Sequence, residues 1–259
     1  MSSVAPWRTP VIAGNWKMNR GPSATREYFR HFKARWAPRA DRTVLFFPPA
    51  VSLSAAAEML RDRPDIGLGV QNIHWEAEGA FTGETSASMA RDAGARYALA
   101  GHSERRHLFG ESDEQVARKV AAALEAELVP VVCVGETLEE RQAGRVEQVI
   151  LRQLDAVLAV VPAAAGPRFM IAYEPVWAIG TGVNASPEDA SAAHAILRRR
   201  IAEHAGEATA AAIPILYGGS VKPDNAAALL GARDVDGVLV GGASLDPASF
   251  AAIAAARPG

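Results

Sequence analysis

Residues 11–19 read VIAGNWKMN, an apolar run that ends in polar residues, and this stretch separates two candidate architectures. An open doubly wound sheet that binds nucleotides normally carries G-x-G-x-x-G after its first strand. Here the first apolar run ends in GNWKMN instead. This ending favours a closed barrel of alternating strands and helices, provided that similar runs recur along the chain.

They do recur, and eight runs in all are rich in Val, Ile and Leu on both faces. The runs are VIAGNW (11–16), TVLFFP (43–48), IGLGVQ (66–71), YALAGH (97–102), VPVVCV (129–134), RFMIAY (168–173), IPILYG (213–218) and DGVLVG (236–241). A strand that is apolar on both faces is typical of a buried parallel sheet rather than of a half-exposed antiparallel one.

Helical stretches are predicted between the runs, and their starts carry capping residues. The predicted helices cover residues 52–61, 112–127, 146–161, 186–204 and 246–256. Ser23, Ser52, Ser112, Ser186 and Asp246 stand where an N-cap is expected. Pro187 and Pro247 fit first helical positions, where a missing N–H costs nothing.

Eight strand–helix units predict an α/β fold of the (β/α)8 TIM-barrel type. Eight similar strands can close on themselves, so no sheet edge is left unpaired. We find no low-complexity linker or change of composition that would divide the chain. We therefore expect residues 1–259 to form a single barrel domain.

Composition excludes several classes of partner. The chain of 259 residues is 49% hydrophobic with a formal net charge of −2, so nucleic acid and anionic membranes are not expected partners. The N-terminal segment lacks a signal-peptide core, and no apolar run is long enough for a membrane helix. We expect a cytoplasmic protein. Cys133, the single cysteine, is expected to be a small buried hydrophobic residue.

Polar residues end several of the runs, and a barrel gathers such residues in one ring at its catalytic face. The first run ends with Asn15 and Lys17, the fourth with His102, Ser103 and Glu104, and the sixth with Glu174. A carboxylate and an imidazole in different surroundings, with an ammonium between them, indicate proton transfer next to a carbonyl. We expect a catalytic site at which a carbonyl compound is enolised.

Glycines at the ends of the seventh and eighth runs indicate the substrate class. Ser220 follows Gly218-Gly219, and Gly241-Gly242 ends the last run. A short helix is expected near 225–230, so backbone N–H groups would converge on an anion where barrels often bind phosphate. The glycines also suit tight turns, but two pairs on adjacent strands favour a phosphorylated small molecule.

The remaining titratable residues predict neither a metal site nor a second catalytic group. The other histidines lack a second ligand at metal spacing, so no metal is expected. Glu136 ends the fifth run just before a helical stretch, and we interpret it as a helix-capping and salt-bridging residue.

Six motifs together resemble the triosephosphate isomerase family. They are GNWKMN (14–19), QNIHWEAEGAFTGETS (71–86), AGHSERR (100–106), AYEPVWAIGTG (172–182), YGGS (217–220) and VGGASL (240–245). The motifs follow the family's order and spacing over almost the whole chain. We find no departure from the family's pattern at a functional position.

The resemblance implies interconversion of dihydroxyacetone phosphate and D-glyceraldehyde 3-phosphate in glycolysis and gluconeogenesis, without metal or organic cofactor. By the same resemblance, Glu174 is the base and a neutral His102 polarises the carbonyl. Asn15 and Lys17 contact the substrate, and Lys17 offsets its negative charge. The residues that the family pattern assigns to phosphate binding are Gly180, Ser220, Gly241 and Gly242.

Two further expectations concern loops. Pro175–Trp177 and Gly180–Gly182 would be the two hinges of a lid that excludes water from the site. The long loop Gln71–Ser86 carries Trp75 and Phe81, and apolar tips of this kind need a partner. In the family this loop docks into a second subunit, so we expect a homodimer with Thr82 directed toward the partner.

Two other interpretations are considered. Another phosphate-binding barrel enzyme, such as a synthase that acts on a sugar or indole phosphate, would explain the glycines but not His102 opposite Glu174. A barrel that binds without catalysis predicts a damaged catalytic position, and the sequence has none.

Overall fold

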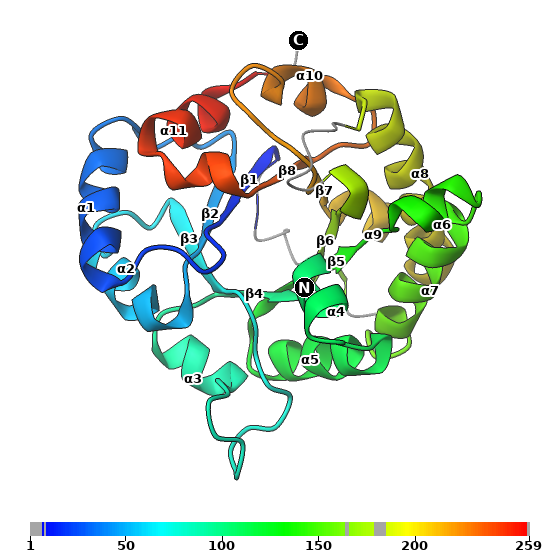
Figure 1. Cartoon of the computed structure of the whole chain (residues 1–259), viewed down its shortest axis with the longest axis horizontal. Coiled ribbons are helices and arrows are strands. Elements are labelled where there is room, and N and C mark those ends of the chain that lie inside the picture. The colour runs from blue at the N-terminus through cyan, green and yellow to red at the C-terminus, as the bar shows by residue number, and fades with distance from the viewer. Residues whose placement is uncertain (1–6, 8, 164–165, 179–184, 258–259) are drawn as a thin grey trace.

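Eight parallel strands form a closed barrel in the computed structural model, which describes residues 7, 9–163, 166–178 and 185–257 (Figure 1). The strands are β1 (Val11–Asn15), β2 (Thr43–Phe47), β3 (Ile66–Val70), β4 (Tyr97–Ala100), β5 (Val129–Val134), β6 (Met170–Tyr173), β7 (Ile215–Tyr217) and β8 (Gly237–Val240). The ring closes because β1 pairs with both β2 and β8, with Val11 opposite Thr43 and Gly237. The predicted (β/α)8 fold is confirmed.

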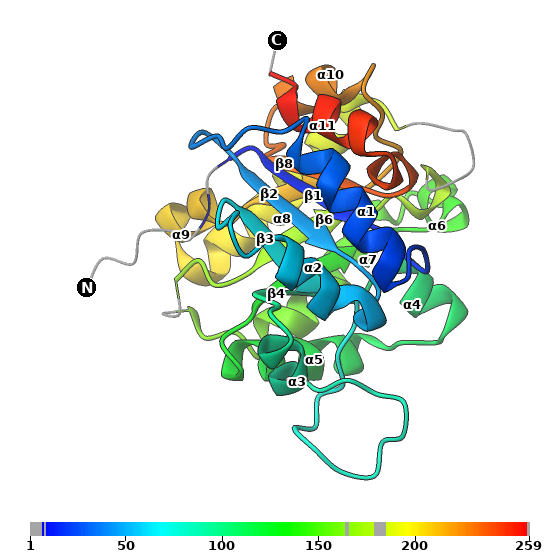
Figure 2. The same cartoon turned by 90° about the vertical axis from the view of Figure 1, so that its left-hand side faces the viewer.

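Most of the helices surround the strands on the outside of the ring, and α4 lies between the strands and α5 (Figures 1 and 2). They are α1 (Pro22–Lys33), α2 (Leu53–Met59), α3 (Ala87–Asp92), α4 (Ser103–Leu108), α5 (Asp113–Glu125), α6 (Leu138–Gln142), α7 (Val146–Leu158), α8 (Pro187–Ala205), α9 (Glu207–Ala212), α10 (Ala226–Gly231) and α11 (Pro247–Ala255). Short 3-10 turns are η1 (Ala50–Ser52), η3 (Val176–Ala178) and η4 (Gly242–Leu245).

Three of the predicted N-caps are confirmed by their side-chain hydrogen bonds. Ser112, Ser186 and Asp246 each accept a hydrogen bond from the backbone N–H three residues later. Pro187 and Pro247 take the first helical positions, as predicted.

The prediction for Ser23 is wrong, and that for Ser52 holds only in part. Gly21 is the N-cap of α1 and Pro22 its first residue, because proline's fixed φ suits that position and starts the helix earlier. Ser52 stands at the N-cap of α2, but its hydroxyl donates to the carbonyl of Arg20 instead of capping the helix.

Alternate residues of each strand face two separate cores. On β5, Val131 and Cys133 belong to the cluster inside the barrel, whereas Val132 and Val134 pack into the layer between strands and helices. Burial raises the pKa of the Cys133 thiol well above its ordinary value, which keeps it protonated and unreactive. A barrel filled in this way is rigid, so residues at the strand ends are held at fixed positions.

Candidate active site

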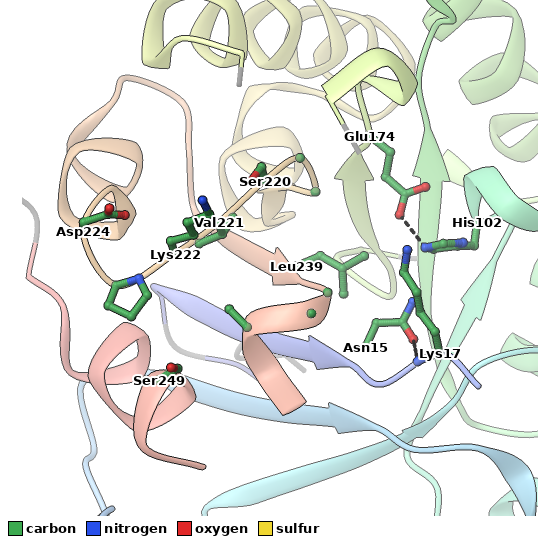
Figure 3. A pocket seen from close by; sticks show the side chains of 16 residues that line it. Asn15, Lys17, His102, Glu174, Ser220, Val221, Lys222, Asp224, Leu239 and Ser249 are labelled. Atoms are coloured by element: carbon green, nitrogen blue, oxygen red, sulfur yellow. Dashed lines mark hydrogen bonds and ion pairs between the residues drawn. The ribbon is translucent and has the colours of Figure 1, made fainter. Parts of the chain in front are cut away.

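A cavity of about 630 Å³ opens at the carboxyl ends of the strands (Figure 3). It is lined by Asn15 at the end of β1, Lys17 just beyond it, His102 at the N-cap of α4, and Glu174 just after β6. Its size lies within the range typical of small-molecule sites. The fold therefore brings the predicted reactive residues to one cavity.

Glu174 directly follows β6, and its side chain is almost completely buried. Its backbone N–H donates to the carbonyl of Val134 at 2.7 Å, which ties the residue to the end of β5. Its carboxylate accepts a hydrogen bond at Oε2 from the backbone N–H of Ser103, at 2.8 Å. The other oxygen, Oε1, lies 3.2 Å from Nε2 of His102. Both oxygens of the carboxylate are thus held by groups of the protein.

The protonation pattern of His102 follows from its neighbours. The backbone N–H of Glu104 can only donate, and it points to Nδ1 of His102 at 3.2 Å. Nδ1 must therefore be the unprotonated nitrogen, which leaves the proton on Nε2. The Nε2–H group faces Glu174 in Figure 3 and is the hydrogen-bond donor that this imidazole offers to the cavity.

Lys17 adopts an unusual backbone conformation that surrounding contacts hold in place. Its φ is 50°, a left-handed value that a non-glycine residue rarely adopts. Its N–H donates to Oδ1 of Asn15 at 3.0 Å, and its carbonyl accepts from Nε2 of Gln71 at 2.9 Å. The ammonium contacts Oε1 of Glu104 at 2.6 Å. Asn15 thus fixes the turn from which the Lys17 side chain reaches the cavity.

The glycine-rich segments after β7 and β8 line the same cavity. Gly218 to Ser220, Gly241 and Gly242 contribute to its wall, and Gly218 lies directly beside the Glu174 side chain. The side-chain amide of Asn225 donates to the carbonyl of Ser220 at 3.0 Å and braces the first of these segments. A helix was predicted over 225–230, and α10 occupies Ala226–Gly231. Gly180, the remaining predicted phosphate-binding residue, lies outside the described residues.

Glu136 does not cap a helix, so that part of its interpretation from the sequence is wrong. Thr137 caps α6, whereas the buried carboxylate of Glu136 accepts hydrogen bonds from the Tyr173 hydroxyl and from Nε1 of Trp177, the latter at 2.8 Å. Arg141 lies 3.4 Å from the same carboxylate, so the predicted salt bridging is present. Glu136 therefore anchors η3, the segment that leads from Glu174 into the expected lid. The predicted second hinge of the lid, Gly180–Gly182, lies outside the described residues.

The sequence places Ser103 and Glu104 beside His102 at the strand ends but assigns neither of them a role at the site. Ser103 holds Glu174 through its backbone N–H, which no side-chain pattern reveals. Glu104 contacts Lys17 through a pairing across 87 positions in the chain.

Gly135 has no side chain, and this allows the backbone of Glu174 to lie close against it. A Cβ at residue 135 would stand 1.8 Å from the Glu174 carbonyl oxygen, and both Gly135 backbone groups bond to the Gln153 amide. We expect Gly135→Ala to lower the free energy of unfolding by about 1–3 kcal/mol, because the backbone there cannot shift freely. Urea unfolding measures this change.

The matched control for this variant is Gly21→Ala, since no atom lies within 4 Å of a Cβ built at that exposed position. It should lose less stability than Gly135→Ala. Equal urea midpoints for the two variants would contradict the close-approach explanation.

Comparison with known proteins agrees with this geometry. A model of the triosephosphate isomerase family matches residues 10–257. Triosephosphate isomerase of Symbiobacterium thermophilum is 51% identical over 96% of this chain and 97% of its own length. The enzymes of Solibacter usitatus and Chloroflexus aurantiacus are 47% and 49% identical, over 95% and 94% of this chain and 98% and 97% of theirs. The chain belongs to the triosephosphate isomerase family.

Proposed function

We propose that this protein is an isomerase that interconverts dihydroxyacetone phosphate and D-glyceraldehyde 3-phosphate through an enediolate, a step of glycolysis and gluconeogenesis. The observation that carries the proposal is the approach of the Glu174 carboxylate to Nε2 of His102, at 3.2 Å, in a cavity that Lys17 also lines. Membership of the family supports the same reaction.

Glu174 is the proposed base. A proton next to a carbonyl is weakly acidic, so its removal needs a carboxylate close to carbon and stabilisation of the oxygen that becomes negative. In this structure the carboxylate of Glu174 accepts a hydrogen bond from the Ser103 N–H and faces His102. Substrate must therefore displace these contacts before Glu174 can reach its carbons.

His102 and Lys17 are the proposed stabilisers of the enediolate. The Nε2–H of a neutral imidazole can donate to the carbonyl oxygen and stay bonded as that oxygen gains charge. The Lys17 ammonium, which contacts Glu104 at 2.6 Å, adds a positive charge at the cavity and is proposed to reduce the negative charge of the bound substrate. Asn15 holds the Lys17 turn and is proposed to contact substrate as well.

The phosphate is proposed to bind at Ser220, Gly241 and Gly242, with Gly180 added from the expected lid. Lining of one cavity by the first three residues supports this placement. Backbone N–H groups at glycine-rich turns suit a phosphate because no side chain blocks its approach. No metal or organic cofactor is assigned a role in this proposal.

A coupled assay tests the reaction. Dihydroxyacetone phosphate is supplied to the purified protein, and a dehydrogenase specific for D-glyceraldehyde 3-phosphate reports product through a nicotinamide signal. We expect turnover that a phosphorylated hydroxamate, a planar mimic of the enediolate, inhibits more tightly than substrate binds. Absence of turnover in a folded preparation would refute the proposal.

A homodimer through the loop Gln71–Ser86 is the proposed assembly, with Thr82 toward the partner subunit. This loop projects from the barrel between β3 and α3 in Figures 1 and 2. Beside it a second cavity of about 310 Å³ is lined by Phe81, Thr82 and Phe109, among others. Met18 is 94% exposed, and the carbonyl of its neighbour Lys17 accepts a hydrogen bond from Gln71 at the start of this loop.

A buried polar atom at this cavity also suggests a missing partner. Oε1 of Glu111 is buried without a hydrogen bond to any residue within the described ranges, whereas Oε2 accepts from Arg105 and Lys119. Buried polar atoms are normally paired, by protein or by ordered water. A second subunit bound in this cavity would supply a hydrogen-bond donor to Oε1 of Glu111, or would enclose a water molecule that donates to it.

Light scattering at micromolar concentration measures the assembly, and we expect twice the 27.3 kDa mass of one chain. Replacing Met18 and Phe109 together by Asp should shift the protein toward the monomer, because charge is costly inside an apolar interface. Val160→Asp, on the C-terminal side of α7, changes an exposed apolar residue elsewhere and serves as the control. A monomeric wild-type mass would contradict the dimer.

A cytoplasmic location and a single domain over residues 1–259 complete the proposal. Within the described ranges, the protein contains no helix with the length and apolar character needed to cross a membrane. The family's reaction uses small phosphorylated metabolites, which are found in the cytoplasm, and it requires neither nucleic acid nor a membrane.

A further inference from the structure

The end of the barrel opposite the catalytic cavity carries a separate, arginine-rich cavity of about 490 Å³. Its lining includes Thr43, Ile66 and Tyr97, which are the first residues of β2, β3 and β4. The catalytic residues lie beyond the opposite ends of the strands, so roughly 15 Å of strand separates the two sites. We name this site the basal arginine cavity.

Four arginines line the basal arginine cavity, against one carboxylate, Asp65. The arginines are Arg42, Arg61, Arg63 and Arg96. Asp41 pairs with Arg42 and Asp65 with Arg63, so two of the four positive charges are left without a carboxylate. The cavity therefore attracts anions, although the chain as a whole does not.

Two of the four guanidinium groups are fixed and already paired. Arg42 has a side chain only 2% exposed, and it bonds to the carboxylate of Asp41 and to the carbonyls of Ala254 and Ala256. Arg63 forms a two-bond fork with Asp65, at 2.7 Å for each bond. These groups form a rigid polar wall.

The other two guanidinium groups are unpaired. Arg61 and Arg96 are exposed, and neither side chain has a hydrogen bond or an ion pair with any residue that the structure describes. Arg96 and Tyr97 also line an adjoining cavity of about 560 Å³ with Arg91, so Arg96 stands between the two hollows. The phenol of Tyr97 has a pKa raised by burial and therefore remains a neutral hydrogen-bond group.

We propose that the basal arginine cavity binds a small phosphorylated anion, with Arg61 and Arg96 as its charged contacts and Tyr97 beside them. A guanidinium presents a planar fork of donors that matches two phosphate oxygens, so two unpaired forks suit a ligand with two or more negative charges. The volume fits a small molecule rather than a polymer. The site is separate from the isomerase cavity and does not depend on its activity.

Calorimetric titration with pyrophosphate at low ionic strength tests this site in the full-length protein. The catalytic cavity is first saturated with the phosphorylated hydroxamate, so that heat from that cavity is suppressed. We expect a saturable binding event that weakens as salt is added. Thermal unfolding in the same buffer should move to higher temperature with pyrophosphate, because a ligand of the native state stabilises it.

The double variant Arg61→Gln/Arg96→Gln should lower the pyrophosphate affinity at least about tenfold, because both charged forks are lost. The matched control is Arg30→Gln, which removes an exposed arginine of α1 that lines neither the basal arginine cavity nor the adjoining one. Wild-type isomerase turnover in the double variant would separate this site from the catalytic one. Unchanged pyrophosphate binding in the double variant, or equal loss in the control, would overturn the proposal.

Discussion

Glu174→Asp should lower kcat by at least about 10²-fold while substrate still binds. The shorter side chain withdraws the carboxylate by about one methylene from the carbon that it must reach, and displacement of a catalytic group by about 1 Å can cost two orders of magnitude. The backbone of Glu174 stays fixed by Val134, so the chain cannot move forward to compensate. Steady-state kinetics with dihydroxyacetone phosphate measure the loss.

Glu207→Asp provides the control, because Glu207 lies exposed at the start of α9, away from the cavity. Its kcat should equal that of the wild type. A Glu174→Asp enzyme that also kept wild-type turnover would show that another group removes the proton.

His102→Gln should lower kcat by about 10²–10³-fold, the usual cost of losing one donor to a developing oxyanion. Glutamine can still accept from the Glu104 N–H, but its amide is a poorer match to the position of Nε2. Because the imidazole is proposed to act on the charge of the transition state, KM should change much less than kcat.

His194→Gln is a useful comparison, since His194 is a buried histidine outside the cavity. Burial lowers its pKa to about 4, and its Nδ1 lies 2.9 Å from the carbonyl of Asp234. That variant should lose stability rather than turnover per folded molecule. A His102→Gln enzyme with wild-type kcat would remove the electrophile role from His102.

The strands could be predicted because their sequence signal is local. VPVVCV gave β5 without error, since six apolar residues in sequence fit a strand buried on both sides. At β7 the predicted run began two residues too early, because Ile213 is buried but lies outside the ladder that starts at Ile215. Burial sets the composition of a run, and hydrogen bonding sets its ends.

The residues at the strand ends could be placed in one cavity because barrel topology fixes where strand ends meet. The rule that parallel strands of a barrel end on the same face was enough to place four residues in the cavity: Asn15, Lys17, His102 and Glu174. Their roles remain predictions that the kinetic variants test.

Contacts between distant segments could not be predicted from patterns along the chain. Glu136 binds Trp177 across 41 positions, and the Ser103 N–H binds Glu174 across 71. The basal arginine cavity likewise joins Arg61 and Arg96, which the sequence places on unrelated segments. Such pairings depend on how the strands are aligned in the closed barrel. That alignment cannot be deduced from the local pattern of apolar and polar residues.

A crystal structure of the complex with the phosphorylated hydroxamate tests the central claim most directly. We predict that Nε2 of His102 and Nζ of Lys17 lie within hydrogen-bonding distance of the ligand oxygens, and that the Glu174 carboxylate has left the Ser103 N–H to face the ligand's planar centre. A ligand bound elsewhere, or a Glu174 carboxylate still bonded to Ser103 and turned away from the ligand, would contradict the account.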